Sequence, residues 1–444
     1  MVSVAAPLAA QDPPIEQGVR IGITYTPGLR PGMLVLGGAR AAVLDSVRAI
    51  LQRDLRYSDR FEMITLPGGD SLFLGIAGVA DSGDDAASSE GSAGPYVNHS
   101  LYAALGASFA VAILADADTA TAQLTLYDVL GETARRTIAL PLKALDDPDF
   151  RMSVHRVADD IVRAASGEPG SAATRLLFIQ RGRLRRVDFD GADVVTLSPF
   201  GVAAFSPAWA PGGDRIVYTE LAEGWGRLVV GDPLGDVFLP VPETEGLLNY
   251  AAAFSPDGAL VAFTRSGDEG TEVYTYNLAR DCCLQRLTVG RFSDNLSPTF
   301  SPDGRRIAFV STRAGLPQIY VMAADGTGQE LFAPFDYGVT GSSLAPEWSP
   351  DGTRIAFHRD VLGSPQVFIM DARSRMVRQL TSAGRNEDPT WAPDGRHIAF
   401  ISSRTGRRQI WVIDVETGRV RQLTQAGDTR LPAWSPRIPE PTNP

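Results

Sequence analysis

The sequence predicts an α+β multidomain protein, in which a small N-terminal α/β domain precedes a six-bladed β-propeller closed by its C-terminal strand. Three observations predict this fold. One phrase recurs along the second half of the chain, incomplete copies flank the complete ones, and the first part of the chain mixes helix and strand patterns. We expect the α/β domain in residues 15–166 and the propeller in residues 174–436.

The repeated phrase joins an aromatic residue to a Pro-Asp-Gly or similar turn and then to an apolar run, as in "APEWSPDGTRIAFHRD" from Ala345. Similar phrases begin at Ser206, Ala251, Ser297 and Asp388. Their aromatic residues are separated by 43 to 48 residues, at Trp209, Phe254, Phe300, Trp348, Trp391 and Trp434. Such a period indicates one small supersecondary unit copied many times.

Each unit contains four short apolar runs separated by turns. In the unit that begins at Asp388 the runs read "PTWA", "HIAFIS", "QIWVIDV" and "VRQLT". Short runs with hairpin-length loops make an antiparallel meander. A four-stranded meander repeated at this period is typical of a propeller blade.

The blade count depends on two fragments. Full units begin near residues 207, 252, 298, 346 and 389. Before them, residues 175–199 supply three strands without the opening phrase, and after them residues 431–436 supply only that phrase. The fragments together complete one blade, which predicts six blades and a C-terminal strand that covers an otherwise open sheet edge.

Residues 15–166 carry the pattern of a small α/β domain. We expect strands at 19–26, from Arg60, and near 109–117, 122–130 and 134–142, and helices over 39–57, 96–105 and 149–165. Residues 81–94 contain no apolar residue larger than alanine, which predicts a disordered loop. Residues 166–173 link this domain to the propeller.

The composition argues against several classes of function. The net charge is −11, whereas nucleic-acid binding needs a basic surface. The only lysine, Lys143, does not follow a glycine-rich turn, so there is no P-loop. No run of apolar residues is long enough to span a membrane.

The N-terminus and the cysteines bear on the compartment. Residues 1–14 resemble the end of a signal peptide with cleavage after Ala10, the alternative being a frayed terminus. Cys282 and Cys283 are adjacent in a predicted turn. They either close a small ring in an oxidising compartment or remain free thiols, and they have no second pair with which to bind zinc.

Catalytic patterns are missing from the sequence. There is no G-x-S-x-G elbow and no H-E-x-x-H, and we interpret His155, His358 and His397 as structural. The four repeated aspartates before glycine should accept local backbone hydrogen bonds: Asp257, Asp303, Asp351 and Asp394. We therefore expect no enzyme activity, no cofactor and no metal site.

An α/β domain of this order before "PxWSPDGxxIAF" units resembles the TolB family, the periplasmic component of the Tol-Pal system. The resemblance also rests on "VRIGIT", on "ILQRDLRYSDRF" (residues 50–61), on "ALGASFAVAI", and on a closing helix with His155, Ala158, Asp159 and Ile161. The insertion at 81–94 and "LVLG" in place of a "VVPF"-like second strand depart from the family pattern. The resemblance implies a periplasmic protein–protein adaptor.

The connections between units carry a polar residue five positions before each aromatic, and we expect these side chains to ring the mouth of the central channel. In the family this mouth binds Pal, the peptidoglycan-associated lipoprotein, and the N-terminal segment engages TolA, the inner-membrane partner. The residues assigned to Pal are Asn249, Tyr250, Asn295, Asn386, Glu387 and Arg430. Those assigned to TolA are Val19, Arg20 and Ile21, within 15–26. Two alternatives remain: the propeller of a peptidase or other hydrolase, and a periplasmic ligand-sensing propeller.

Overall fold

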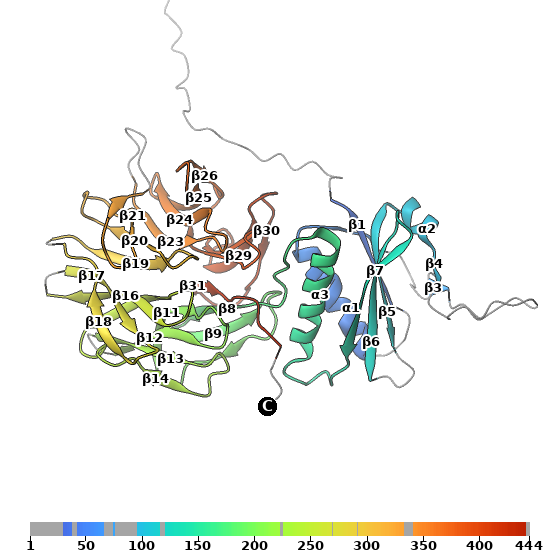
Figure 1. Ribbon diagram of the computed structural model, residues 1–444, viewed down its shortest axis with the longest axis horizontal. Helices are drawn as coiled ribbons and strands as arrows, with labels where there is room; N and C mark the ends of the chain where they lie inside the picture. Colours follow the sequence, from blue (N-terminus) through green and yellow to red (C-terminus); the bar gives the residue numbers. More distant parts are fainter. Residues whose placement is uncertain are drawn as a thin grey trace, which may run out of the picture.

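The computed structural model describes residues 30–37, 42–65, 74–75, 96–115, 120–222, 225–268, 270–290, 292–332 and 341–440. A small α/β domain and a β-propeller lie side by side in it (Figure 1). The predicted leader 1–14, the strand expected at 19–26 and the loop predicted at 81–94 lie outside the described residues. Within the described residues, no helix is long and apolar enough to cross a membrane.

The N-terminal domain is built on a five-stranded sheet with the order β2-β1-β5-β6-β7. β1 is parallel to both β2 and β5, and the remaining pairs are antiparallel. The strands are β1 (Gly32–Gly37), β2 (Glu62–Met63), β5 (Ala107–Ala115), β6 (Thr121–Asp128) and β7 (Thr133–Pro141). A separate two-stranded pair joins β3 (Leu74–Gly75) to β4 (Tyr96–Val97).

Helices cover both faces of this sheet. Met33 and Val35 of β1 pack with α1 (Ala42–Tyr57) and α3 (Phe150–Ser166). Leu34 and Leu36 point the other way and pack near α2 (His99–Ala104), as the alternation of a strand requires. The helix predicted over residues 39–57 is α1, and its apolar side chains are buried at Val47, Ile50, Leu51 and Leu55 among others.

The link between the domains is held by one buried side chain. The Asp159 carboxylate of α3 accepts hydrogen bonds from the backbone N–H groups of Ala172 (2.7 Å) and Ala173 (3.0 Å). Gly170 lies so close that a Cβ there would stand 2.3 Å from Asp159 Oδ1. Burial raises the pKa of Asp159 to about 7, although these two donors lower it. The C-terminal part of the link is therefore tied to α3.

The propeller consists of four four-stranded sheets and one eight-stranded sheet among the described residues. The closing sheet contains β10 (Val195–Thr196), β9 (Arg183–Asp188), β8 (Arg175–Gln180) and β31 (Thr429–Trp434). The other four-stranded sheets are β19 (Asn295–Phe300), β20 (Arg306–Ser311), β21 (Gln318–Ala323) and β22 (Glu330–Leu331); β23 (Ser343–Trp348), β24 (Arg354–Val361), β25 (Ser364–Asp371) and β26 (Val377–Gln379); and β27 (Asn386–Trp391), β28 (His397–Ser402), β29 (Gln409–Asp414) and β30 (Val420–Gln422).

The eight-stranded sheet contains two meanders. The first is β11 (Ala203–Trp209), β12 (Ile216–Ala222), β13 (Trp225–Gly231) and β14 (Phe238–Pro240). The second is β15 (Leu248–Phe254), β16 (Leu260–Gly267), β17 (Gly270–Asn277) and β18 (Cys282–Arg286). One parallel pair, Gly226 with Leu248, joins them.

The last strand closes the propeller as the two sequence fragments predicted. β31 pairs antiparallel with β8, with Thr429 opposite Gln180 and Trp434 opposite Leu176. Trp434 Nε1 also donates a hydrogen bond to Thr174 Oγ1 over 2.8 Å. A strand from the C-terminus thus completes a sheet whose other strands begin at Arg175.

The repeated aspartates play the local role predicted for them. Each accepts a hydrogen bond from the backbone N–H two residues further on, with distances of 2.9–3.1 Å, at Asp257, Asp303, Asp351 and Asp394. The glycine after each has a φ of 65–69°, a left-handed conformation that glycine adopts without steric cost. These carboxylates therefore stabilise turns.

Candidate functional site

The propeller has a central channel lined by the first strand of each meander. These inner strands follow one another in a closed ring, β11, β15, β19, β23, β27 and β31. They enclose a cavity of about 340 Å³. Each inner strand contains a register shift and one left-handed residue with a φ of 50–53°, at Ser206, Ala251, Ser297, Ala345, Asp388 and Leu431.

The two faces of the propeller differ in what they contact. The mouth face is formed by the second-to-third strand hairpins and the connections between meanders, at 181–182, 199–202, 242–247, 267–268, 292–294, 312–317, 362–363, 382–385, 403–408 and 425–428. The opposite face, the domain face, carries the first-to-second and third-to-fourth strand turns. It meets the N-terminal domain, because Asp59 contacts His397 at the start of β28 and Arg53 pairs with Asp190 after β9. Among the described residues, the N-terminal domain therefore meets the face opposite the mouth.

Two carboxylates face the channel. Glu347 Oε1 accepts hydrogen bonds from the Trp391 backbone N–H (2.9 Å) and Thr390 Oγ1 (3.1 Å), and burial raises its pKa to about 7. Burial also raises the pKa of Asp388, whose backbone N–H donates to His358 Nδ1 over 3.1 Å. Burial lowers the pKa of His358, so the imidazole is neutral and accepts at Nδ1.

The described polar groups of the channel do not form a pair of hydroxyl nucleophile and histidine base. None of the hydrogen bonds described for the residues lining it joins a serine or threonine hydroxyl to a histidine. Nucleophilic catalysis requires a hydroxyl or thiol within hydrogen-bond reach of a base. The polar groups of the channel instead bond neighbouring inner strands to one another, as Glu347 of β23 does with β27.

The expected ring of accessible polar side chains is wrong for the asparagines. Asn249, Asn295 and Asn386 are 0% exposed, as are Ser343 and Thr429 at the same position of the repeat. Asn249 Nδ2 contacts the carbonyl oxygens of Gly226 (2.9 Å), Thr244 (2.6 Å) and Leu247 (2.9 Å). A buried amide that is fully hydrogen bonded has little left to offer a partner.

These asparagines belong to a network that is repeated from meander to meander. An arginine near the end of the second strand donates to the asparagine Oδ1, with distances of 2.8–3.2 Å, from Arg265, Arg313 and Arg404. The same guanidinium groups lie over aromatic rings of the second and third strands, 4.7–5.7 Å from the ring centroids. Cation–π stacking and hydrogen bonding thus hold each connection to its sheet.

The other three assigned residues share the next position of the repeat, where the side chain is accessible. Tyr250 is half-buried, with its ring centroid 6.4 Å from that of Phe205. Glu387 is half-buried and accepts a hydrogen bond from Arg385 (3.0 Å). Arg430 is exposed, and its guanidinium lies 3.4 Å from Asp428. Val19, Arg20 and Ile21 lie outside the described residues.

The sequence reasoning missed exposed apolar side chains on the mouth face. Phe200, Phe292 and Leu362 are 97%, 100% and 101% exposed, and each lies in a mouth-face loop. Leu247 and Leu316 are also exposed there, at 40% and 49%. The sequence pattern that could have indicated them is a large apolar residue beside glycine or arginine in a connecting segment. It occurs in "PFG", "GRF" and "VLG". Turns of the domain face expose apolar side chains too, at Val194, Leu234, Val237 and Met376, so exposure alone does not distinguish the two faces.

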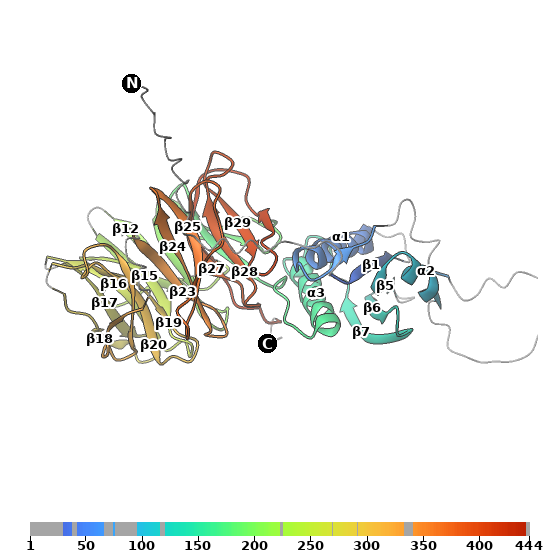
Figure 2. The ribbon, with the colours of Figure 1, turned by 90° about the horizontal axis from the view of Figure 1, so that it is seen from above.

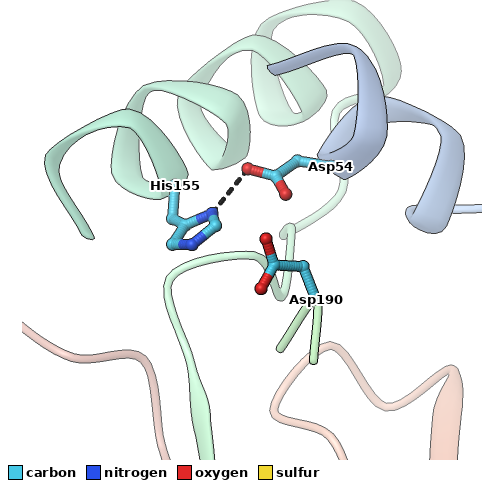
Figure 3. Close-up of side chains that lie close together, drawn as sticks. All are labelled: Asp54, His155 and Asp190. Carbon is cyan, nitrogen blue, oxygen red and sulfur yellow. Dashed lines mark hydrogen bonds and ion pairs between the residues drawn. The ribbon is translucent and has the colours of Figure 1, made fainter. Parts of the chain in front are cut away.

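A second cluster of titratable groups lies at the domain junction (Figure 3). His155 Nδ1 of α3 lies 2.6 Å from Asp54 Oδ2 of α1, and both residues are buried. Asp190, in the turn after β9, faces them from the propeller. Burial alone would lower the pKa of His155, but the charges of Asp54, Asp190 and Asp188 outweigh it and raise the pKa.

The junction cluster has ligand atoms from Asp54, His155 and Asp190 within 4.8 Å of one another. However, Arg53 and Arg151 both pair with Asp190. The two guanidinium groups supply the positive charge that a bound cation would bring. We therefore interpret the cluster as an ionic contact between α1, α3 and the propeller, which agrees with the structural role predicted for His155.

A related contact involves β28. His397 Nδ1 lies 2.6 Å from Asp394 Oδ2, and its Nε2 lies 3.4 Å from Asp59 Oδ2 of the N-terminal domain. Burial would lower the pKa of His397, but Asp394 and Asp59 raise it to about 9. In three other meanders the serine two residues before the repeated aspartate donates a hydrogen bond to it, at Ser255, Ser301 and Ser349. Ala392 occupies this position before Asp394, which leaves the Asp394 carboxylate available to His397. Seen from above, α1 and α3 lie beside this sheet (Figure 2).

The comparisons with known proteins agree with this architecture. The model of the TolB beta propeller domain matches residues 163–334 and 337–439. The chain belongs to the TolB family. The Tol-Pal system protein TolB of Anaeromyxobacter dehalogenans strain 2CP-1 is 34% identical over 67% of this chain and 65% of its own length. TolB of Anaeromyxobacter sp. strain K is 36% identical over 52% of this chain and 53% of its own length.

The alignments thus span less than two thirds of each of these TolB relatives. Among solved structures, TolB from Acinetobacter baumannii superposes with a TM-score of 0.75 and covers 93% of this chain and 98% of that chain. At 23% sequence identity this likeness shows the fold alone. Both an N-terminal domain and a propeller are therefore TolB-like here.

Proposed function

We propose that this chain is a periplasmic adaptor of a Tol-Pal system, and that its propeller mouth binds a Pal-like lipoprotein domain. The TolB relatives are named as Tol-Pal system proteins, which supports the system. The observation that carries the site is that the mouth face, which exposes Phe200, Phe292 and Leu362, lies opposite the face that meets the N-terminal domain. The channel has no hydrolase arrangement among its described hydrogen bonds, which favours binding over catalysis.

The proposed propeller has six blades. Support comes from the closed order of six inner strands and from the single pair that joins the two meanders of the eight-stranded sheet. We count those two meanders as separate blades. Six blades give the mouth six connections, so a partner of standard interface size, about 800 Å² on each side, would touch several of them.

The binding residues we now favour are those that reach solvent. Tyr250, Arg430 and Glu387 stay in the proposal, and Phe200, Phe292 and Leu362 join them. Aromatic and arginine side chains are enriched among interface hot spots, because they bury much area and still satisfy their polar ends. The buried Asn249, Asn295 and Asn386 position the connections that carry these side chains.

The proposal also assigns a TolA-like inner-membrane protein to the N-terminal segment, at Val19, Arg20 and Ile21. This part rests on the family resemblance of residues 15–26. A peptide of residues 15–26 should compete with the full chain for a TolA-like domain. A peptide that binds no such domain, tested beside a full chain that does, would move the contact elsewhere.

Calorimetric titration of the full chain with the periplasmic domain of a Pal-like lipoprotein from the same organism tests the main proposal. We expect binding, and we expect Tyr250→Ala with Arg430→Ala to weaken it by about 1–4 kcal/mol in total. The matched control is Asp303→Ala with Asp351→Ala on the domain face, which should cost stability and leave affinity intact, since both carboxylates hold turns. Absence of binding by the parent protein would refute the proposed function.

A further inference from the structure

The mouth face is divided by charge. Four exposed arginines, the basic sector, lie around β27 and β31, at Arg181, Arg385, Arg407 and Arg430. Four exposed carboxylates, the acidic sector, lie around β15 and β19, at Glu243, Glu245, Asp268 and Asp294, and one exposed arginine, Arg313, lies among them in the hairpin between β20 and β21. In the closed order of inner strands, β27 and β31 are neighbours, and so are β15 and β19. One strand separates the two pairs on either side, so the sectors lie across the channel from each other.

The two strands between the sectors bring apolar groups. On one side β11 carries Phe205, and Phe200 stands in the connection just before it. On the other side β23 carries Leu344, and Leu362 tops the hairpin of the same sheet. Exposed apolar side chains also lie in the acidic sector, at Leu247, Phe292 and Leu316. What differs around the channel is the charge, which is mostly basic around β27 and β31 and mostly acidic around β15 and β19.

Local ion pairs only partly neutralise the sectors. Arg385 pairs with Glu387 at 3.0 Å, and Arg430 lies 3.4 Å from Asp428. Glu245 lies 3.5 Å from Arg227, which also pairs with Glu220 at 2.7 Å. These are surface contacts, which contribute little and leave the arginines and carboxylates open to a partner's charges.

A propeller mouth has a recognition problem of its own. Its repeats are so alike that a partner seated over the channel could settle in several rotational positions with similar backbone contacts. Charge that differs from one repeat to the next removes this degeneracy, because a mismatched rotation places like charges together. The residue that follows the buried polar residue of each inner strand differs between repeats. It is Tyr250 in β15, Glu387 in β27 and Arg430 in β31.

We propose that the two charged sectors fix the rotational orientation of the docked partner, whose acidic side lies over Arg181, Arg385, Arg407 and Arg430 and whose basic side lies over Glu243, Glu245, Asp268 and Asp294. This inference rests on the proposed function, since the partner is the Pal-like domain. It adds that this domain carries opposite charges on two sides of its docking surface. Between these two sides it makes apolar contacts with Phe200 and Leu362.

Three charge-reversal variants of the full chain test the inference. The first changes the basic sector (Arg181→Glu, Arg407→Glu and Arg430→Glu) and the second changes the acidic sector (Glu243→Arg, Glu245→Arg and Asp268→Arg). The matched control reverses three exposed arginines in turns of the domain face, Arg280→Glu, Arg305→Glu and Arg373→Glu. Tryptophan fluorescence during thermal unfolding checks that each variant folds, because all six tryptophans lie in the propeller.

Affinity for the Pal-like domain is then measured by titration at low and at high salt. We expect each sector reversal to weaken binding about ten-fold or more at low salt, and less at high salt, where exposed charges are screened. The control should change affinity less than about two-fold. If reversal of the acidic sector instead tightens binding, only the net charge of the partner matters and the orientation claim is wrong. Unchanged affinity in both variants would also overturn it while leaving the proposed function standing, whereas a parent protein that does not bind would refute that function itself.

Discussion

Replacing Asn249 by alanine should destabilise the propeller, although it changes no exposed side chain of the mouth face. Asn249 is 0% exposed, its Nδ2 contacts three backbone carbonyls, and its Oδ1 accepts from Arg265 Nε over 2.8 Å. A hydrogen bond to a charged group contributes about 1.5–3 kcal/mol, and a neutral one about 1 kcal/mol. Because such contributions do not add fully, we expect a loss of about 3–5 kcal/mol.

The assay is denaturant unfolding followed by tryptophan fluorescence, which reports the propeller because all six tryptophans lie there. Arg430→Ala is the matched control, since Arg430 is exposed at 57% of its side chain and should change stability little. An Asn249→Ala variant with the midpoint of the parent protein would refute the structural role. One that keeps its stability and loses partner binding would return Asn249 to the binding surface.

Three further predictions follow from the closing strand, the cysteines and the domain junction. Removal of residues 431–444 deletes most of β31 and exposes the edge of β8, so cooperative unfolding should be lost and aggregation should appear in thermal scans; a truncated protein that melts like the parent would contradict this. Cys282 and Cys283 are bonded to each other, so a thiol reagent should modify protein purified without a reductant only after reduction, and immediate labelling would be the contrary result. The raised pKa of His397, about 9, means that its contribution to stability is present below the unfolded value near 6.5 and is lost as pH rises through 9. The unfolding midpoint should therefore fall more steeply between pH 7 and about pH 10 in the parent than in His397→Gln, and equal slopes would remove His397 from the junction.

Periodicity predicted the repeated part of the fold well. The strand order within each meander and the pairing of β31 with β8 could be read from the sequence, because each unit repeats its turn residues at fixed positions and the two end fragments complement each other. The joining of two meanders in one eight-stranded sheet could not. The contact of the N-terminal domain with β28 could not be read in this way. It depends on His397 and Ala392, which both depart from the repeat pattern. Asp59, which contacts His397, lies far away in the sequence.

The same periodicity led the predicted binding surface to include three buried asparagines. Asn249, Asn295 and Asn386 recur because every meander needs the same internal hydrogen bonds, so their regular spacing indicates structure. A surface that recognises one partner has to differ between repeats. The informative positions are therefore the irregular ones, such as Tyr250 and Arg430, together with loop residues such as Phe200 that no pattern singles out.

Hydrogen–deuterium exchange of the full chain, with and without the Pal-like domain, tests the central claim most directly. A partner seated on the propeller mouth should slow exchange in the mouth-face segments 199–202, 242–247, 362–363 and 382–385. The domain-face turns around Asp257, Asp303 and Asp351 should exchange at an unchanged rate. Protection confined to those turns, with the mouth-face segments unaffected, would contradict the account.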